Sequence, residues 1–180
     1  MTNATGRERT ACTQGATPGV LWAVECGQFP SHTEQSEKAR KLLERLAGFL
    51  PTVEHDASGA PCIAGHPELH ISISHCAKAV AVAVSTKQKV GIDIESRRKV
   101  GDSLMERVCT PDELDKIRRS DDPEMAFLRC WTRKEAVLKC RGTGIKGFGS
   151  MVEASKASDC NVEEVDCGQP GVVAALATAL

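Results

Sequence analysis

The sequence predicts an α+β fold of two similar lobes, related by a pseudo-twofold axis, with antiparallel sheet packed against helices. Three short apolar segments at residues 69–74, 79–85 and 90–95 follow one another closely, as the strands of a meander do. Leucines recur at helical spacing in residues 36–50, and a second long helical pattern covers residues 125–140. A strand–helix–strand rhythm thus occurs in each half of the chain, which favours two related lobes.

The N-terminal half begins with a polar segment, and we expect residues 1–19 to form a flexible tail. The run LWAVEC that follows predicts a strand over residues 21–26. Ser31 and Glu34 have the spacing of a capping box, so an amphipathic helix should begin there. Because the residue before a proline avoids helical geometry, Pro51 should end that helix.

Three strands are expected after the turn-forming sequence DASGAP. LHISIS alternates between apolar and polar residues, which is the pattern of a half-buried strand. AVAVAVS is apolar up to its last residue and indicates a central strand that is buried on both faces. VGIDIE is the third strand, and the three together should form an antiparallel meander.

Helices dominate the C-terminal half. A short helix is expected within residues 96–110, and Pro111 should begin the next one because proline is favoured in the first helical position. Pro123 should open a long helix that Gly142 ends. Further strands are expected at SMVEAS and at GVVAALAT.

Composition excludes several classes of function. Of the 180 residues 41% are hydrophobic, which is enough for a core, and the net charge of −1 argues against a general nucleic-acid binder. The longest apolar runs, AVAVAV and VVAALA, are far too short to cross a bilayer, so we expect no membrane association. The nine cysteines include no CxxC pair, which is typical of reduced thiols in a cytoplasmic protein.

VGIDIE raises a question, because it is apolar yet carries two acids. In a strand Gly91, Asp93 and Glu95 share one face, and two neighbouring carboxylates repel unless a positive group lies between them. If Glu135 of the long helix joins them, three carboxylates suit a hard divalent cation such as Mg²⁺. Two simpler interpretations stay open: the polar face of an edge strand, and an ordinary helical ion pair between Glu135 and Lys139.

The segment HISISHC ends in His75, at the strand terminus where a site would lie. An imidazole N–H there could donate to a phosphate, although a lone histidine is more often structural. Together with the acids and Lys139, this indicates phosphate chemistry, in which lysines hold the phosphates and a metal offsets their charge.

The motifs SxSH, GIDIE and WTRKEAxxKxxGxG, in this order, resemble the 4′-phosphopantetheinyl transferases of the Sfp type. The resemblance covers roughly residues 57–150. It implies Mg²⁺-dependent transfer of 4′-phosphopantetheine from coenzyme A to a serine of an apo acyl or peptidyl carrier protein, an activity of the holo-carrier-protein synthase type. We expect a monomer rather than a dimer, and a site at the cleft between an N-terminal lobe (20–85) and a C-terminal lobe with the metal site (86–180).

The resemblance also implies roles for individual residues. The metal ligands would be Asp93, Glu95 and Glu135; the catalytic residues Glu135 and Lys139; and the coenzyme-binding residues Ser74, His75, Lys134 and Lys139. Trp131 would pack beneath the site, and Glu113 matches a family acid whose role is less certain.

Ala60 stands where the family often has lysine, in Gly59-Ala60-Pro61, and this departure predicts weaker coenzyme binding. An alternative function is therefore a catalytically degenerate module of the same fold that binds coenzyme A or a carrier protein. A third interpretation is a metal-dependent phosphoesterase that releases phosphate without any carrier.

Overall fold

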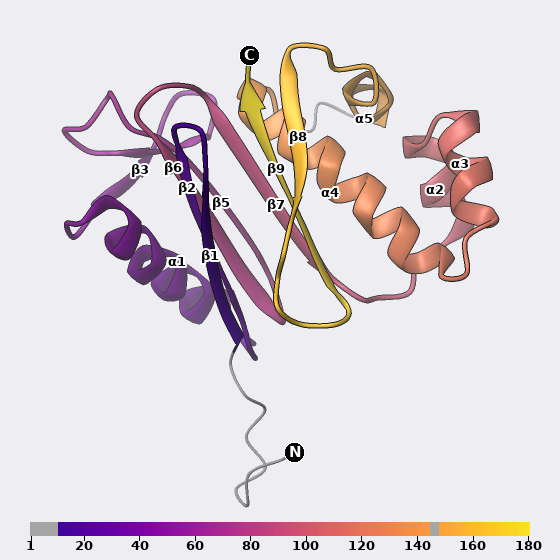
Figure 1. Cartoon of the computed structure of the whole chain (residues 1–180), viewed down its shortest axis with the longest axis horizontal. Coiled ribbons are helices and arrows are strands. Elements are labelled where there is room, and N and C mark those ends of the chain that lie inside the picture. Colours follow the sequence, from indigo (N-terminus) through magenta and orange to yellow (C-terminus); the bar gives the residue numbers. More distant parts are fainter. Residues whose placement is uncertain (1–10, 145–147) are drawn as a thin grey trace, which may run out of the picture.

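The computed structural model describes residues 11–144 and 148–180, which form antiparallel sheets flanked by helices (Figure 1). The strands are β1 (Ala11–Thr17), β2 (Val20–Cys26), β3 (Val53–His55), β4 (Pro61–Ile63), β5 (His70–Cys76), β6 (Ala79–Ser85), β7 (Val90–Ser96), β8 (Cys160–Val165) and β9 (Val172–Ala179). The helices are α1 (His32–Ala47), α2 (Asp102–Val108), α3 (Pro111–Arg118), α4 (Pro123–Arg141) and α5 (Phe148–Ala154). The α+β class with antiparallel sheets packed against helices is thereby confirmed, whereas the pseudo-twofold relation stays a prediction.

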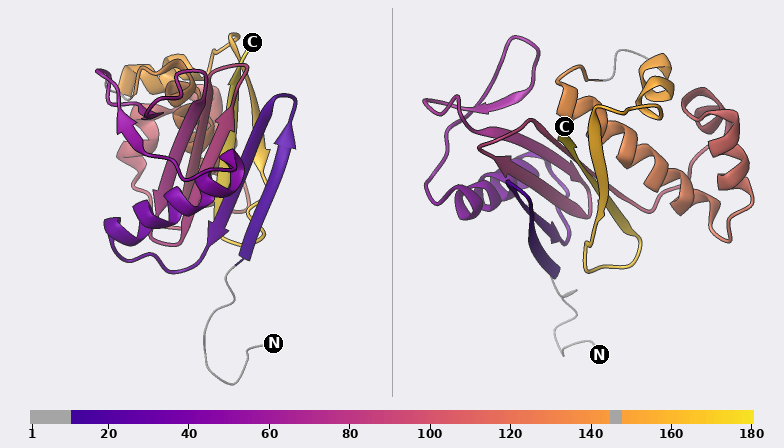
Figure 2. Two further views of the ribbon diagram at one scale, coloured as in Figure 1. Left: turned by 90° about the vertical axis from the view of Figure 1, so that its left-hand side faces the viewer. Right: turned by 45° about the horizontal axis from the view of Figure 1, so that its top comes forward.

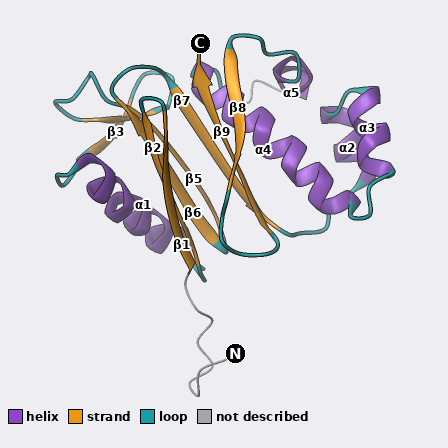
Figure 3. Cartoon of the chain, in the orientation of Figure 1, coloured by secondary structure: helices purple, strands orange, loops and turns teal. Residues whose placement is uncertain are grey.

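Two sheets form the centre of the protein and two long helices cover them from outside (Figure 3). The first sheet has the order β1-β2-β6-β5 and the second the order β7-β9-β8. Leu42 and Leu43 of α1 pack on one face of the first sheet, and Figure 2 shows α1 lying across its strands. The other face packs against the second sheet, whose far side contacts α4.

The strand β6 joins these layers, because its side chains alternate between the two faces of the first sheet. Val80 and Val82 pack with α1, whereas Ala81 and Ala83 pack with the second sheet. Every residue of β6 is buried, and the strand lies between β2 and β5, as the apolar run predicts. Small alanines on the inner face allow the two sheets to approach closely.

The predicted three-strand meander is wrong in its third strand. β5 and β6 pair as expected, but the backbone of β7 pairs with β9. Toward β5, the N–H groups of Ile92 and Ile94 instead donate to the hydroxyl groups of Ser72 and Ser74, at 2.9 and 3.3 Å. These serine side chains act in place of a backbone ladder, so the two sheets meet here without merging.

The two faces of β7 have the alternation that its sequence predicts. Ile92 and Ile94 are fully buried against the first sheet, and Gly91 faces α4. A Cβ atom at Gly91 would lie 2.0 Å from the carbonyl oxygen of Ala136 and 2.5 Å from the backbone nitrogen of Cys140. The glycine therefore lets the helix backbone approach the strand that carries Asp93.

The variant Gly91→Ala should be strongly destabilised, because the atoms in the way belong to the helix backbone and cannot turn aside. Overpacking of this kind costs about 3 kcal/mol of unfolding free energy. Urea unfolding followed by circular dichroism measures it. Gly101→Ala is a control, because a Cβ there meets nothing within 4 Å; equal stability of the two variants would contradict the close approach.

The flexible tail expected over residues 1–19 was predicted too long. Ala11–Thr17 forms β1, which pairs along its length with β2, while residues 1–10 lie outside the described residues. Its composition gave little strand signal, because β1 is an edge strand with every second residue exposed. Gly15 has a packing reason of its own, since a Cβ there would lie 2.4 Å from the ring of Trp22.

Helix starts follow the predicted capping signals, but one predicted helix end is wrong. Ser31 and Glu34 form both hydrogen bonds of the capping box, and Thr110 caps α3 in the same way. α1 ends at Ala47, because Gly48 adopts the left-handed conformation with φ of 81°, before Pro51 is reached. Gly142 ends α4 as expected.

The strand expected at SMVEAS is a helix, α5. Its buried residues Met151 and Ala154 are three apart, which is a helical spacing, and both join the core beneath α4. Over such a short stretch the two periodicities are easily confused. The strands β3, β4 and β8 were not expected, whereas β9 lies at the predicted GVVAALAT. In the described part of the chain no helix has the length and apolarity needed to cross a membrane.

Candidate active site

Asp93 lies at the centre of the candidate site, on the face of β7 that looks toward α4. Its side chain is 8% exposed, and Oδ1 accepts hydrogen bonds from Ser74 and from Lys139, each at 2.7 Å. The other carboxylate oxygen, Oδ2, is buried without a hydrogen-bond partner. A buried carboxylate oxygen without a partner is costly and suggests that a ligand is bound there during function.

Glu135 comes from the facing side of α4, where helical spacing places it one turn before Lys139. The residue is only 8% exposed. Burial, and next the negative charge of Asp93, raise the pKa of Glu135 to about 7, against the opposing effect of Lys139. Glu135 can therefore gain and lose a proton near neutral pH, as a general base must.

Glu95 completes the predicted set of acids but lies nearer the surface. Its carboxylate pairs with Arg98 at 3.3 Å, and its charge also raises the pKa of Glu135. The described residues bring only one group of three metal-ligand atoms within 4.8 Å of one another, and it is not this one. The three acids thus interact electrostatically, but in this structure Lys139 and Arg98 are the positive groups beside Asp93 and Glu95.

Ser74 has a different place from the one predicted. It is 7% exposed, donates to Asp93, and accepts the backbone N–H of Ile94. The one O–H donor of Ser74 is given to Asp93, so in this structure Ser74 orients that carboxylate. Of the two serines of β5, Ser72 is the one that lines the neighbouring pocket.

Lys134 also departs from its predicted role as a phosphate ligand. Its side chain is 3% exposed, and its ammonium group donates to Glu113 Oε2 at 2.7 Å and to the carbonyl oxygen of Val108 at 2.6 Å. Burial alone would raise the pKa of Glu113, but the hydrogen bonds from Lys134 and from the N–H of Thr110 hold it below its ordinary value. This buried ion pair joins α3 to α4, which gives Glu113 a structural position.

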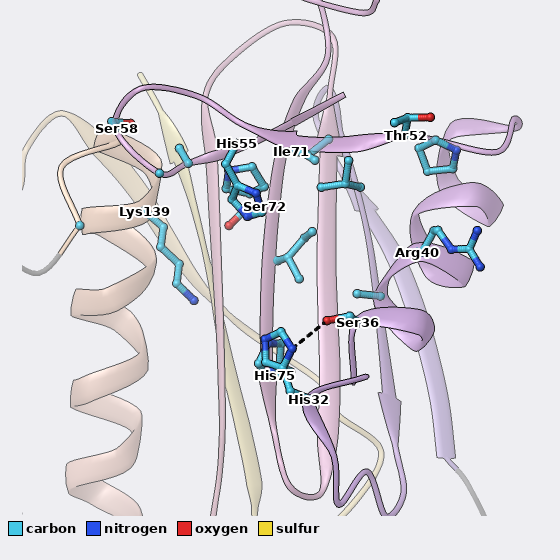
Figure 4. Close-up of a pocket in the computed structure, with 18 of the residues that line it drawn as sticks. His32, Ser36, Arg40, Thr52, His55, Ser58, Ile71, Ser72, His75 and Lys139 are labelled. Carbon is cyan, nitrogen blue, oxygen red and sulfur yellow. Dashed lines mark hydrogen bonds between the residues drawn. The ribbon is translucent and has the colours of Figure 1, made fainter. Parts of the chain in front are cut away.

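A cavity of about 1070 Å³ lies beside these acids, between α1, the β3–β4 hairpin, β5 and the end of α4 (Figure 4). Among the described residues that line it, Arg40 from α1 and Lys139 from α4 are positively charged and Glu37 from α1 is negatively charged. Three imidazoles also line it, those of His32, His55 and His75. Cations, imidazoles and apolar walls together suit a phosphorylated ligand with an apolar part.

His75 was predicted as a site residue, and it lines this cavity. Its ring packs edge-on against His32, with ring centroids 5.2 Å apart, and Figure 4 shows the two side by side. Burial, and next the neighbouring His32 and Lys139, lower the pKa of His75, so the ring is neutral at pH 7 and can donate one N–H. His32 is itself positioned by Ser36, 3.4 Å away.

Sequence reasoning did not identify His32, His55 or Ser72 as cavity residues, because they come from elements far apart in the chain. The sequence marks Arg40 only weakly as a cavity residue, as a basic residue on the first helix. Trp131, expected beneath the site, packs against Phe127 with ring centroids 6.0 Å apart.

Comparisons with known proteins agree with these features. The family model of the 4′-phosphopantetheinyl transferase superfamily matches residues 89–173. The 4′-phosphopantetheinyl transferase AcpT of Salmonella typhimurium is 34% identical over 132 residues, which cover 69% of each chain. The 4′-phosphopantetheinyl transferase HetI of a Nostoc species is 30% identical over 131 residues, covering 65% of this chain and 55% of HetI.

The chain spans about half the length of some of these relatives. With 4′-phosphopantetheinyl transferase psf-1 of Bacillus pumilus it shares 32% identity over 108 residues, which cover 59% of this chain and 46% of psf-1. The AcpT match, however, extends over more than two thirds of both proteins. The chain therefore belongs to the 4′-phosphopantetheinyl transferase superfamily.

Proposed function

We propose that this protein transfers the 4′-phosphopantetheine group of coenzyme A to a serine of an acyl or peptidyl carrier protein, with Mg²⁺ as the metal. The observation that carries the proposal is the position of Lys139. Its side chain lines the cavity, and its ammonium group also donates to Asp93 at 2.7 Å. One residue thus links a cavity that suits a phosphorylated ligand with a group of buried acids.

The chemistry asked of the protein is alignment and charge compensation. The carrier serine must attack a phosphorus of the diphosphate in line, and adenosine 3′,5′-bisphosphate must leave. Glu135 would accept the serine proton, for which a pKa of about 7 is well suited. Lys139 and the N–H of His75 would hold phosphate oxygens in the cavity, and the walls would exclude water from the diphosphate.

The residues present fit a divalent cation. Asp93 Oδ2 is buried with no partner, and oxygen ligands of this kind are what Mg²⁺ prefers. Asp93, Glu95 and Glu135 would hold the ion, with Lys139 turned from Asp93 toward the phosphates. When bound, the ion would offset negative charge on the diphosphate.

A carrier-modification assay tests the proposal. The protein is incubated with coenzyme A, Mg²⁺ and several apo carrier proteins, and the mass of each carrier is measured. We expect a mass increase equal to one phosphopantetheine on at least one carrier, and no increase without Mg²⁺. Release of phosphate without any carrier would instead indicate a phosphoesterase.

The degenerate-module alternative is favoured by one observation, Ala60, which lines the cavity where the family often has lysine. Tight binding of coenzyme A without transfer to any carrier would support that alternative. The complete set of Asp93, Glu95, Glu135 and Lys139 supports the enzyme.

Ala60→Lys should strengthen coenzyme A binding about fivefold, since an exposed ion pair contributes about 1 kcal/mol. The lysine would face the ligand phosphates from the β3–β4 hairpin, and the backbone N–H of residue 60 would keep its hydrogen bond to Asp56. Isothermal titration calorimetry measures the dissociation constant. Ala60→Gln adds similar length without charge, so an equal gain in both variants would show that charge is not the cause.

We keep the predicted division into lobes at residues 85 and 86 in this proposal. This boundary falls at the connection between β6 and β7, where the chain passes from the first sheet to the second. A cytoplasmic location and a monomeric state are part of the proposal as well. Size-exclusion chromatography with light scattering would test the oligomeric state.

A further inference from the structure

A pair of thiols lies behind the candidate site, on the side of α4 that contacts α2 and α3. Cys109 caps the C-terminal end of α2, and Cys130 belongs to α4. The two sulfur atoms and a carboxylate oxygen of Glu113 all lie within 4.8 Å of one another. The two thiols also hydrogen-bond to each other.

The ammonium group of Lys134 lies beside this pair. Lys134 follows Cys130 by one helical turn, and its ammonium group is held in place by Glu113 and by the carbonyl oxygen of Val108. The hydrogen bond from Cys130, and the charge of Lys134, lower the pKa of Cys109 although burial opposes them. The thiolate, which is the reactive form of cysteine, is therefore more populated at Cys109 than at an ordinary cysteine.

A second thiol pair in the same protein provides the contrast. Cys140 and Cys160 also share a hydrogen bond, and both are 9% exposed or less. Burial, and next the contact with Cys160, raise the pKa of Cys140 to about 12, and the carboxylate of Asp159 adds to the effect. Cys140 therefore stays protonated, and both thiols are further from solvent than Cys130, which is partly exposed.

We propose that Cys109 and Cys130 form an oxidisable dithiol, which a hydroperoxide converts to a disulfide that joins the α2–α3 junction to α4. A divalent metal fits the same three ligands less well, because the ammonium group of Lys134 already neutralises Glu113. The disulfide leaves this ion pair in place, and its two sulfur atoms already lie within 4.8 Å of each other.

The reaction balances with one peroxide. The thiolate of Cys109 attacks a peroxide oxygen, which breaks the O–O bond and gives a sulfenic acid and one water after protonation. The sulfur of Cys130 then attacks the sulfenic sulfur, forms the S–S bond and releases a second water. Two thiols are thereby oxidised by two electrons, and the peroxide is reduced.

Peptide mapping tests this proposal without any use of the transferase activity. The full-length protein is treated with hydrogen peroxide, its remaining thiols are alkylated under denaturing conditions, and it is digested with trypsin. Cleavage after Arg107, Lys116, Arg129 and Arg133 puts the two cysteines into the separate peptides VCTPDELDK and CWTR. We expect these peptides joined by a disulfide, two hydrogens lighter than their sum, while Cys140 and Cys160 are alkylated.

Single cysteine variants show which thiols form the cross-link. Cys109→Ser and Cys130→Ser should each abolish this cross-link, and Cys140→Ser should leave it unchanged. The proposal is overturned if both thiols remain alkylatable after peroxide, or if the Cys140–Cys160 pair oxidises equally fast. It is overturned equally if the purified protein carries one zinc per chain that Cys109→Ser removes.

Discussion

Glu135→Gln should lower the rate of phosphopantetheine transfer by about 10²- to 10⁴-fold, the usual contribution of a general base. Glutamine keeps the size of the side chain but cannot accept a proton from the carrier serine. Steady-state transfer to an apo carrier, measured by mass spectrometry of the product, gives the rate. The wild-type rate should rise with pH as Glu135 loses its proton, at a pH below about 7 when Mg²⁺ is bound, because the cation favours the charged carboxylate. This dependence should disappear in the variant.

The same substitution should stabilise the fold at neutral pH. The native state holds the Glu135 proton up to about pH 7, whereas an unfolded glutamate releases it near 4.5. Wild-type stability therefore falls as pH rises through this window. At pH 8 Glu135→Gln should have a free energy of unfolding higher by roughly 3 kcal/mol, and at pH 4 almost no difference.

Glu153→Gln is the matched control, because this exposed glutamate of α5 forms a local surface pair with Lys156. It should change neither the transfer rate nor the stability. Transfer by Glu135→Gln at the wild-type rate would remove Glu135 from the mechanism, whatever its effect on stability.

Asp93→Asn should lower transfer about 10³-fold and abolish tight binding of a divalent cation. The asparagine oxygen can still accept from Ser74, so the fold should be retained, but the charge that opposes Lys139 and attracts a cation is lost. Binding of Mn²⁺, followed by electron paramagnetic resonance, measures the metal site without reference to activity. Asp115→Asn is a control, because Asp115 is a surface residue paired with Arg119.

A second consequence distinguishes a charge effect from a loss of structure. Because Asp93 raises the pKa of Glu135, its neutralisation should lower that pKa. The rising limb of the residual pH–rate profile should therefore move to lower pH in Asp93→Asn. A profile with an unchanged midpoint, or Mn²⁺ binding equal to wild type, would contradict the assignment of Asp93.

Much of the fold could be predicted from sequence because its signals are local. The capping boxes at Ser31 and Thr110 and the glycine after α4 act within a few residues of themselves. The alternation in β5 and β7 likewise follows from strand geometry. β1 and α5 were misjudged because β1 depends on pairing with β2, and α5 on burial beneath α4.

The candidate site was predicted less completely, since the partners of a side chain depend on contacts distant in sequence. Asp93, Glu135, Lys139 and His75 do lie around one region, where β7, α4 and β5 meet. The hydroxyl group of Ser74 and the ammonium group of Lys134, by contrast, already form hydrogen bonds within the protein. The histidines from α1 and the β3–β4 hairpin join the cavity only because those elements cover β5.

The amino-acid sequence alone determined the residue types of the site, most helix boundaries and the family. All of these depend on the spacing of residues along the chain, which the covalent backbone fixes. Only the tertiary structure decided that β7 pairs with β9, that Lys139 neutralises Asp93, and that Lys134 is buried beside two thiols. These features arise from burial and charge between segments tens of residues apart, and no local pattern encodes such distances.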